Sequence, residues 1–133
     1  MHGDDRTWKL VQCIFGSFYL VVVDYRKLSS SYLKHETFSI NDKNRLQILI
    51  PSGCANGHLC LSDYCVFSYK QSCSYIGSAA QFTLKWDDPK IGIYWPTKCP
   101  ILSARDAECS NLWYFNILDK KWNFITTFTV NFI

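Results

Sequence analysis

The chain has 133 residues, a length that fits one domain with one hydrophobic core. Hydrophobic residues make up 48% of the chain, so a packed core is easily supplied. The net charge of +3 is small and the Lys and Arg residues are scattered, so the sequence predicts no nucleic-acid-binding surface. The longest apolar run, Phe18 to Val23, is too short to span a membrane, so no membrane partner is expected.

Seven cysteines stand out in this composition. Their number is odd and no two of them have the CxxC spacing of a zinc site. The first ten residues are charged where a secretory leader would be apolar. These features together predict free thiols in a protein of the reducing cytoplasm. The cysteines are Cys13, Cys54, Cys60, Cys65, Cys73, Cys99 and Cys109.

The N-terminal part of the chain is predicted to form short strands. Residues 8–15 and 18–23 are apolar and are interrupted by Gly16 and Ser17, which predicts a hairpin with a tight turn. Residues 24–31 are polar and rich in serine, which is typical of a loop. Residues 34–40 alternate between polar and apolar, as a half-buried strand should.

The pattern of short strands and turns continues to the end of the core. Further strands are predicted at residues 45–50, 59–61, 64–69 and 81–86, with turn residues at 41–44 and 51–53. Before residue 100 no stretch has a helical period over three turns. Many short strands at close intervals indicate an all-β sandwich or barrel. We expect one core domain over residues 1–110, followed by an aromatic extension, residues 111–133, of unclear structure.

Several sequence blocks resemble one known family. Residues 51–58 resemble the proline-x-glycine turn of the second cupin motif, and Leu61-Ser62-Asp63 and residues 67–70 follow it. Further blocks are found at residues 8–11, 86–93, 94–96 and 100–106. In this order they resemble the dTDP-4-dehydrorhamnose 3,5-epimerase family over residues 2–106. The resemblance implies a cupin, a jelly-roll β-sandwich barrel that works without a metal.

The resemblance also implies an activity. Members of the family invert C3, C5 or both of a nucleotide-linked 4-keto-6-deoxy sugar through an enolate, in surface polysaccharide biosynthesis. They need no cofactor and form homodimers. The short connection from His2 to Lys9 resembles the branch that acts on GDP-linked 4-keto heptoses in capsule pathways, so the nucleotide remains open between dTDP, GDP and CDP. Because the family's arginine-glycine-x-histidine motif is usually preceded by some tens of residues, we expect a shortened N-terminal region.

Four catalytic residues follow from the resemblance. His2 would be the base, Asp88 would orient its imidazole, Lys9 would face the C4 oxygen, and Tyr69 would deliver a proton to the opposite face. Each residue also has a structural interpretation when it is taken alone. These are a disordered terminus for His2, an edge-strand lysine for Lys9, a core aromatic for Tyr69 and an Asp-Pro turn for Asp88.

The predicted binding residues argue against a metal. Metal-binding cupins carry a histidine three residues after the glycine of the second motif, where this chain has Asn56. His2, His35 and His58 share no ligand spacing, so no metal site is expected. Asn56 would bind a sugar hydroxyl or a phosphate. His58 has the same strand parity and faces either that cavity or the core.

Two other functions remain open at this point. The chain could be a non-catalytic, shortened cupin paralogue that binds a nucleotide sugar without turnover. It could also be a 3,4-ketoisomerase of the same superfamily, which would need its acid and base in different places.

Overall fold

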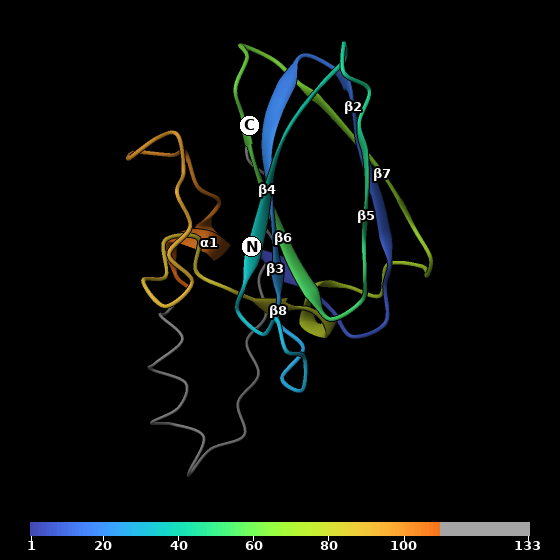
Figure 1. The fold of residues 1–133 in the computed structure, drawn as a ribbon, viewed down its shortest axis with the longest axis vertical. Coiled ribbons are helices and arrows are strands. Elements are labelled where there is room, and N and C mark those ends of the chain that lie inside the picture. Colours follow the sequence, from blue (N-terminus) through green and yellow to red (C-terminus); the bar gives the residue numbers. More distant parts are fainter. Residues whose placement is uncertain (110–133) are drawn as a thin grey trace.

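The regular elements of the protein are almost all antiparallel strands, arranged in two facing sheets (Figure 1). The computed structural model describes residues 1–109. One sheet has five strands in the order β4-β3-β6-β1-β8, and the other has three in the order β5-β2-β7. The predicted all-β sandwich is therefore confirmed for this part of the chain. The elements are β1 (His2–Gly3), β2 (Lys9–Phe15), β3 (Ser17–Asp24), β4 (His35–Asn41), β5 (Gln47–Ile50), β6 (Cys54–Cys60), β7 (Val66–Gln71), η1 (Ser78–Ala80), β8 (Phe82–Thr83) and α1 (Ala104–Ala107).

The space between the two sheets holds one hydrophobic core. Phe18 and Leu20 on β3 point from the five-stranded sheet toward Val11 on β2, and all three are fully buried. Successive residues of a strand point to opposite faces, so every second residue of β3 belongs to this core. The cluster consists of Val11, Cys13, Phe18, Leu20, Ile40, Ile50 and Cys54.

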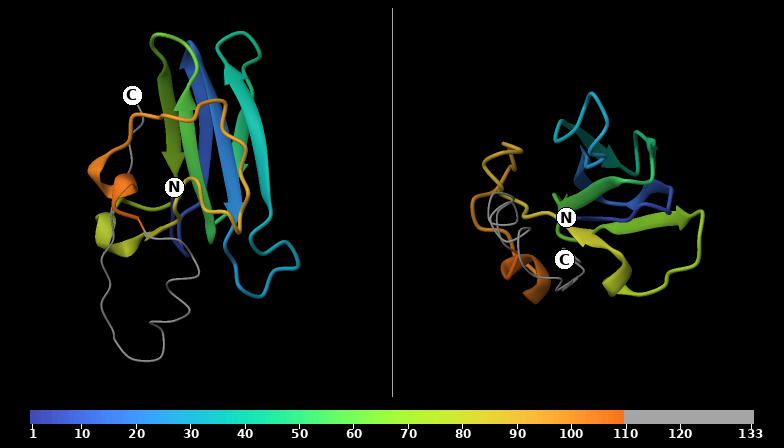
Figure 2. Two further views of the ribbon diagram at one scale, coloured as in Figure 1. Left: turned by 90° about the vertical axis from the view of Figure 1, so that its left-hand side faces the viewer. Right: turned by 90° about the horizontal axis from the view of Figure 1, so that it is seen from below.

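A second core lies on the outer face of the five-stranded sheet. The chain after β8 folds over this face (Figure 2), and Ile91 and Trp95 pack against Val21 and Val23 of β3. The Trp95 indole donates a hydrogen bond to the carbonyl of Trp86 at 2.7 Å. Because β3 is covered on both faces, its sequence reads as an uninterrupted apolar run rather than an alternating one.

The predicted hairpin between residues 8–15 and 18–23 is wrong. β2 pairs with β5 and β7, whereas β3 pairs with β4 and β6 in the other sheet. The chain crosses between the sheets at Gly16, whose φ of 75° favours glycine. The Gly16 amide donates to Asp42 Oδ2 at 2.9 Å, which fixes this corner. A glycine between two apolar runs suits a corner between sheets as well as a hairpin turn.

Other strands also differ from their predicted bounds. β6 begins at Cys54 rather than at Leu59, because pairing with β3 and β1 makes a strand of small and polar residues that propensity disfavours. The strand predicted at residues 81–86 is limited to Phe82–Thr83, and the strand β1 was not predicted. The predicted extension, residues 111–133, lies outside the described residues. Among the residues that are described, no helix is long and apolar enough to cross a membrane.

Candidate active site

His2 lies inside the five-stranded sheet and faces the space between the sheets. It pairs with Asn56 on β6 and with Thr83 on β8, and its side chain is only 7% exposed. Asn56 also pairs with Val22, which packs against the core between the sheets. Since directly opposite residues of paired strands share a face, His2, Asn56 and Thr83 all point inward. The interpretation of His2 as a disordered terminus is therefore wrong, because a paired strand holds it.

Lys9 reaches into the same space from the other sheet. It begins β2, the central strand of the three-stranded sheet, so the edge-strand interpretation is wrong. Its Nζ donates a hydrogen bond to Asn56 Oδ1 at 3.2 Å, across the gap between the sheets. Burial lowers the pKa of Lys9, although the Asp4 carboxylate partly opposes this shift.

His58 faces the inter-sheet space, as its strand parity predicts. Its ring stacks on Phe67 with centroids 4.1 Å apart and planes 11° apart, and it meets the Phe18 ring edge-on at 5.8 Å. Burial lowers the pKa of His58 to about 4, so the ring is neutral at physiological pH. These contacts give His58 an aromatic packing role in the core beside the site.

Tyr69 is on the inner face of the three-stranded sheet. It pairs with the buried Val11, and its ring lies 5.7 Å from that of Phe67. The side chain nevertheless remains 53% exposed. Tyr69 is therefore not enclosed in the core, and a ligand can reach it.

The electrostatic surroundings of His2 keep its imidazole neutral. Burial, together with nearby cationic groups, among them Arg105 and Lys9, lowers its pKa to about 2. The Nδ1 atom lies 3.4 Å from Thr83 Oγ1. A neutral imidazole is the form that can accept a proton from a substrate.

Two buried carboxylates lie on the segment after β8. Asp88, the predicted partner of His2, is 1% exposed and accepts a hydrogen bond from the Lys90 amide at 2.8 Å, within its own turn. Asp106 is equally buried, and its Oδ1 lies 3.0 Å from the nitrogen of Met1, the residue before His2. Sequence reasoning missed Asp106. The available signal was its place at the end of the family-like block of residues 100–106.

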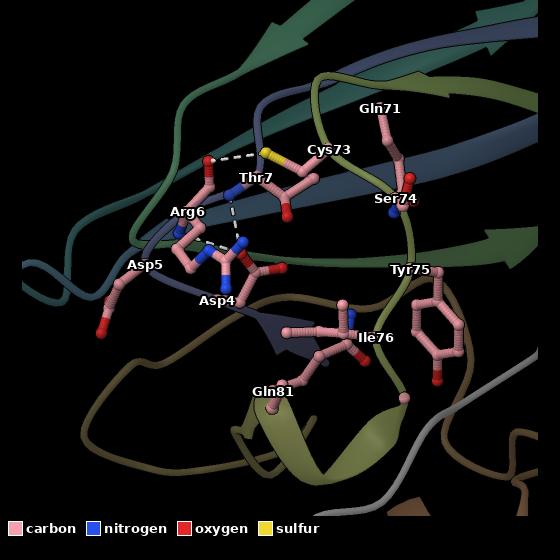
Figure 3. Close-up of a pocket in the computed structure, with 12 residues that line it drawn as sticks. Asp4, Asp5, Arg6, Thr7, Gln71, Cys73, Ser74, Tyr75, Ile76 and Gln81 are labelled. Atoms are coloured by element: carbon pink, nitrogen blue, oxygen red, sulfur yellow. Dashed lines mark hydrogen bonds between the residues drawn. The ribbon is translucent and has the colours of Figure 1, made fainter.

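A cavity of about 220 Å³ lies beside the Lys9 end of the site (Figure 3). One wall is the chain between β1 and β2, and the other is the chain from the end of β7 to β8. Gln71, which pairs with Lys9, connects the cavity to the site, although the predicted catalytic residues are not part of its lining. The lining residues are Asp4, Asp5, Arg6, Thr7, Gln71, Cys73, Ser74, Tyr75, Ile76, Gly77, Ala80 and Gln81.

No metal-binding cluster is formed within residues 1–109. No three or more His, Cys, Asp or Glu side chains in this range are grouped so that they could hold a metal ion. All seven cysteines are free thiols. The polar groups described at this site are thus an imidazole, an ammonium, an amide and a phenol, which suit proton transfer and binding of polar ligands.

Comparisons with known proteins agree with one another. Residues 1–113 match the family model described as dTDP-4-dehydrorhamnose 3,5-epimerase. An enzyme of that name from Salmonella typhimurium is 37% identical over 106 residues, covering 79% of this chain and 57% of the relative. Another, from Methanothermobacter thermautotrophicus, is 42% identical over 103 residues, covering 75% of this chain and 55% of the relative. The chain thus spans a little over half the length of these curated relatives.

Solved structures confirm the predicted cupin jelly-roll fold. The dTDP-6-deoxy-D-glucose-3,5-epimerase of Legionella pneumophila, in complex with dTDP-4-keto-L-rhamnose, superposes with a TM-score of 0.79 at 30% sequence identity. The superposition covers 90% of this chain and 63% of that one.

Proposed function

The chain belongs to the dTDP-4-dehydrorhamnose 3,5-epimerase family, and we propose that it inverts C3, C5 or both of a nucleotide-linked 4-keto-6-deoxy sugar. One observation supports this function above the others. A buried, neutral His2 lies on the same inner face as Asn56, which holds the Lys9 ammonium from the opposite sheet. A base and a cation are thus directed into one space.

The placement of these groups suits epimerisation through an enolate. His2 would take the proton from the carbon beside the ketone, and the Lys9 ammonium would stabilise the negative charge that develops on the ketone oxygen. Inversion needs a proton donor on the other face of the sugar. His2 and Tyr69 belong to opposite sheets, so a sugar bound between the sheets would have one of them on each face.

Asn56 would act mainly by holding Lys9 in place. Its Oδ1 accepts from the Lys9 ammonium, which leaves its amide NH₂ for a sugar hydroxyl or a phosphate. Asp88 remains the predicted partner of His2, and Asp106 is a second candidate because it lies beside Met1. Both carboxylates are buried.

The cavity beside the site would take the nucleotide. Arg6 supplies a positive charge for a diphosphate, and Tyr75 supplies an aromatic surface for a base. The solved Legionella relative holds a dTDP-linked sugar, which makes dTDP the first nucleotide to test, with GDP and CDP as alternatives. We also propose a homodimer, because the edge strands β5 and β7 of the small sheet leave unpaired backbone groups.

The test is deuterium exchange into substrate. The protein is incubated in D₂O with dTDP-4-keto-6-deoxyglucose, and NMR measures deuterium at C3 and C5. We expect exchange with the parent protein, none with His2→Asn, and parent-like exchange with the control His35→Asn on the edge strand β4. Tight nucleotide-sugar binding without exchange for any nucleotide would favour the non-catalytic paralogue, and a 3-keto product would favour the ketoisomerase.

A further inference from the structure

We propose that Cys73 is a thiol-modification site in the cavity, where a low-molecular-weight peptide disulfide forms a mixed disulfide that excludes the nucleotide. The inference rests on the proposed function insofar as it assigns the nucleotide to this cavity. Cys73 lines the cavity together with Arg6 and Gln81. Figure 3 shows its sulfur atom where the two walls meet.

The thiol is placed by contacts between the two walls. Cys73 Sγ lies 3.8 Å from the carbonyl oxygen of Arg6 and 3.7 Å from Ser72 Oγ. Ser72 Oγ in turn accepts a hydrogen bond from the Trp8 amide at 3.0 Å, and the Ser72 amide donates to the Trp8 carbonyl at 3.0 Å. A group attached to Cys73 would therefore be held between the walls.

The cavity also contains a buried polar group that lacks a protein partner. Gln81 is 8% exposed and lines the cavity, and its Oε1 has no hydrogen-bond partner among the described residues. An unsatisfied buried acceptor costs about 1–3 kcal/mol unless a ligand supplies a donor. The amide N–H groups of a small peptide are such donors.

The cavity offers one cationic group that could hold a carboxylate, beside the carboxylates of Asp4 and Asp5. Arg6 lines the cavity, and its guanidinium can pair with a carboxylate. Asp4 lines the cavity too, but its Oδ1 already accepts from the amides of Arg6 and Thr7, at 2.9 Å and 2.6 Å. Asp5 is exposed. Glutathione has both features, namely peptide N–H groups and carboxylates, so its disulfide is the probe to use.

The other six thiols are less suited to this reaction. Burial raises the pKa of four of them, which lowers the fraction present as reactive thiolate: Cys13, Cys54, Cys65 (to about 12) and Cys109. Cys60 lies outside the cavity lining. Cys99 is exposed but lies outside the cavity lining. Among all seven, Cys73 alone lines the cavity.

The reaction is a thiol–disulfide exchange. The Cys73 thiolate attacks one sulfur of glutathione disulfide, the S–S bond of the reagent breaks, and one glutathione thiolate leaves. The product is a mixed disulfide on Cys73, and dithiothreitol reverses it. The disulfide reagent is the oxidant, so no other electron acceptor is needed.

The test measures labelling and nucleotide binding separately. The full chain is incubated with glutathione disulfide, and peptide mass spectrometry follows Cys73 and Cys99. We expect dTDP at ten times its Kd to slow labelling of Cys73 about tenfold, by simple occupancy, and to leave Cys99 unaffected. Labelled Cys99→Ser protein should bind dTDP at least about tenfold more weakly than the same protein before treatment, whereas treatment should not change dTDP binding by Cys73→Ser.

The proposal is overturned if Cys73 stays unlabelled while Cys99 is fully labelled. It is equally overturned if dTDP gives no protection, or if the labelled protein binds dTDP as well as the untreated one. These readouts do not require turnover. Protection of Cys73 by dTDP without any deuterium exchange into a 4-keto sugar would support the modification site while contradicting the epimerase activity.

Discussion

Replacing Lys9 with methionine would remove an ammonium group from the site while keeping an unbranched side chain of similar length. In the protein this ammonium lies 3.2 Å from Asn56 Oδ1, in the space that His2 also faces. If it stabilises the enolate, Lys9→Met should slow both exchange of the substrate proton and inversion. Both steps pass through the same anion.

The expected size of the effect follows from the geometry. At about 3 Å and an effective dielectric constant of about 20, two unit charges attract by roughly 5 kcal/mol, before the cost of desolvation is subtracted. One preorganised donor is typically worth about 10²–10³ in rate. We therefore expect deuterium exchange to fall about 10²–10³-fold.

The same substitution has two opposing effects on stability. Because burial lowers the pKa of Lys9, the unfolded chain binds this proton more tightly than the folded one. At neutral pH the charge therefore opposes folding, a cost that disappears as pH rises through the unfolded pKa near 10.4. Methionine removes the cost and also the hydrogen bond to Asn56, worth about 1.5–3 kcal/mol for a charged donor. Because these two effects oppose each other, we expect a melting temperature close to that of the parent.

The assay is the D₂O exchange reaction, run beside thermal unfolding on the same samples. Lys70→Met is the matched control, because Lys70 pairs with Leu10 on β2 and is exposed. It should exchange at the parent rate. Exchange by folded Lys9→Met within about threefold of the parent would contradict an electrostatic role for Lys9, since the loss of such a donor costs far more.

Three further outcomes are expected. Tyr69→Phe should leave washout of the first proton largely intact but slow inversion, because it removes only the proposed proton donor on the opposite face. Both rates are measured by NMR. An equal decrease in the two rates would argue against that role for Tyr69. The parent should lose stability as pH falls below 6.5, since the pKa of His58 is lowered to about 4 in the folded state. Between pH 7 and pH 5 the His58 contribution to the free energy of unfolding falls by about 2 kcal/mol, and His58→Gln should remove this contribution in urea unfolding experiments. If the pH dependence of stability is the same in His58→Gln as in the parent, the predicted role of His58 is wrong. Phe18→Ala should destabilise the fold by about 3–5 kcal/mol, because Phe18 is fully buried between the sheets, and a loss below 1 kcal/mol in the same experiment would show that this core can collapse.

The sequence was most informative where local chemistry decides the outcome. Short apolar runs between turn residues predicted most of the strands correctly. The Pro51–Gly53 turn was also predicted, and Gly53 has the positive φ of 77° that such a turn uses. The strand parity of Asn56 and His58 correctly predicted that both lie on the same face of their strand. Local sequence carries this information because turns and alternation depend on neighbouring residues.

The tertiary structure decided how these elements combine. Gly16 suits a hairpin or a corner, and only the pairing of β2 and β3 with different partners shows that the chain changes sheets there. Lys9 and Asn56 meet across that gap, and Asp106 meets Met1 from near the other end of the described chain. Propensity and alternation act over a few residues, whereas these contacts depend on how two sheets and a covering segment pack together. The site therefore depends on packing that local sequence does not encode.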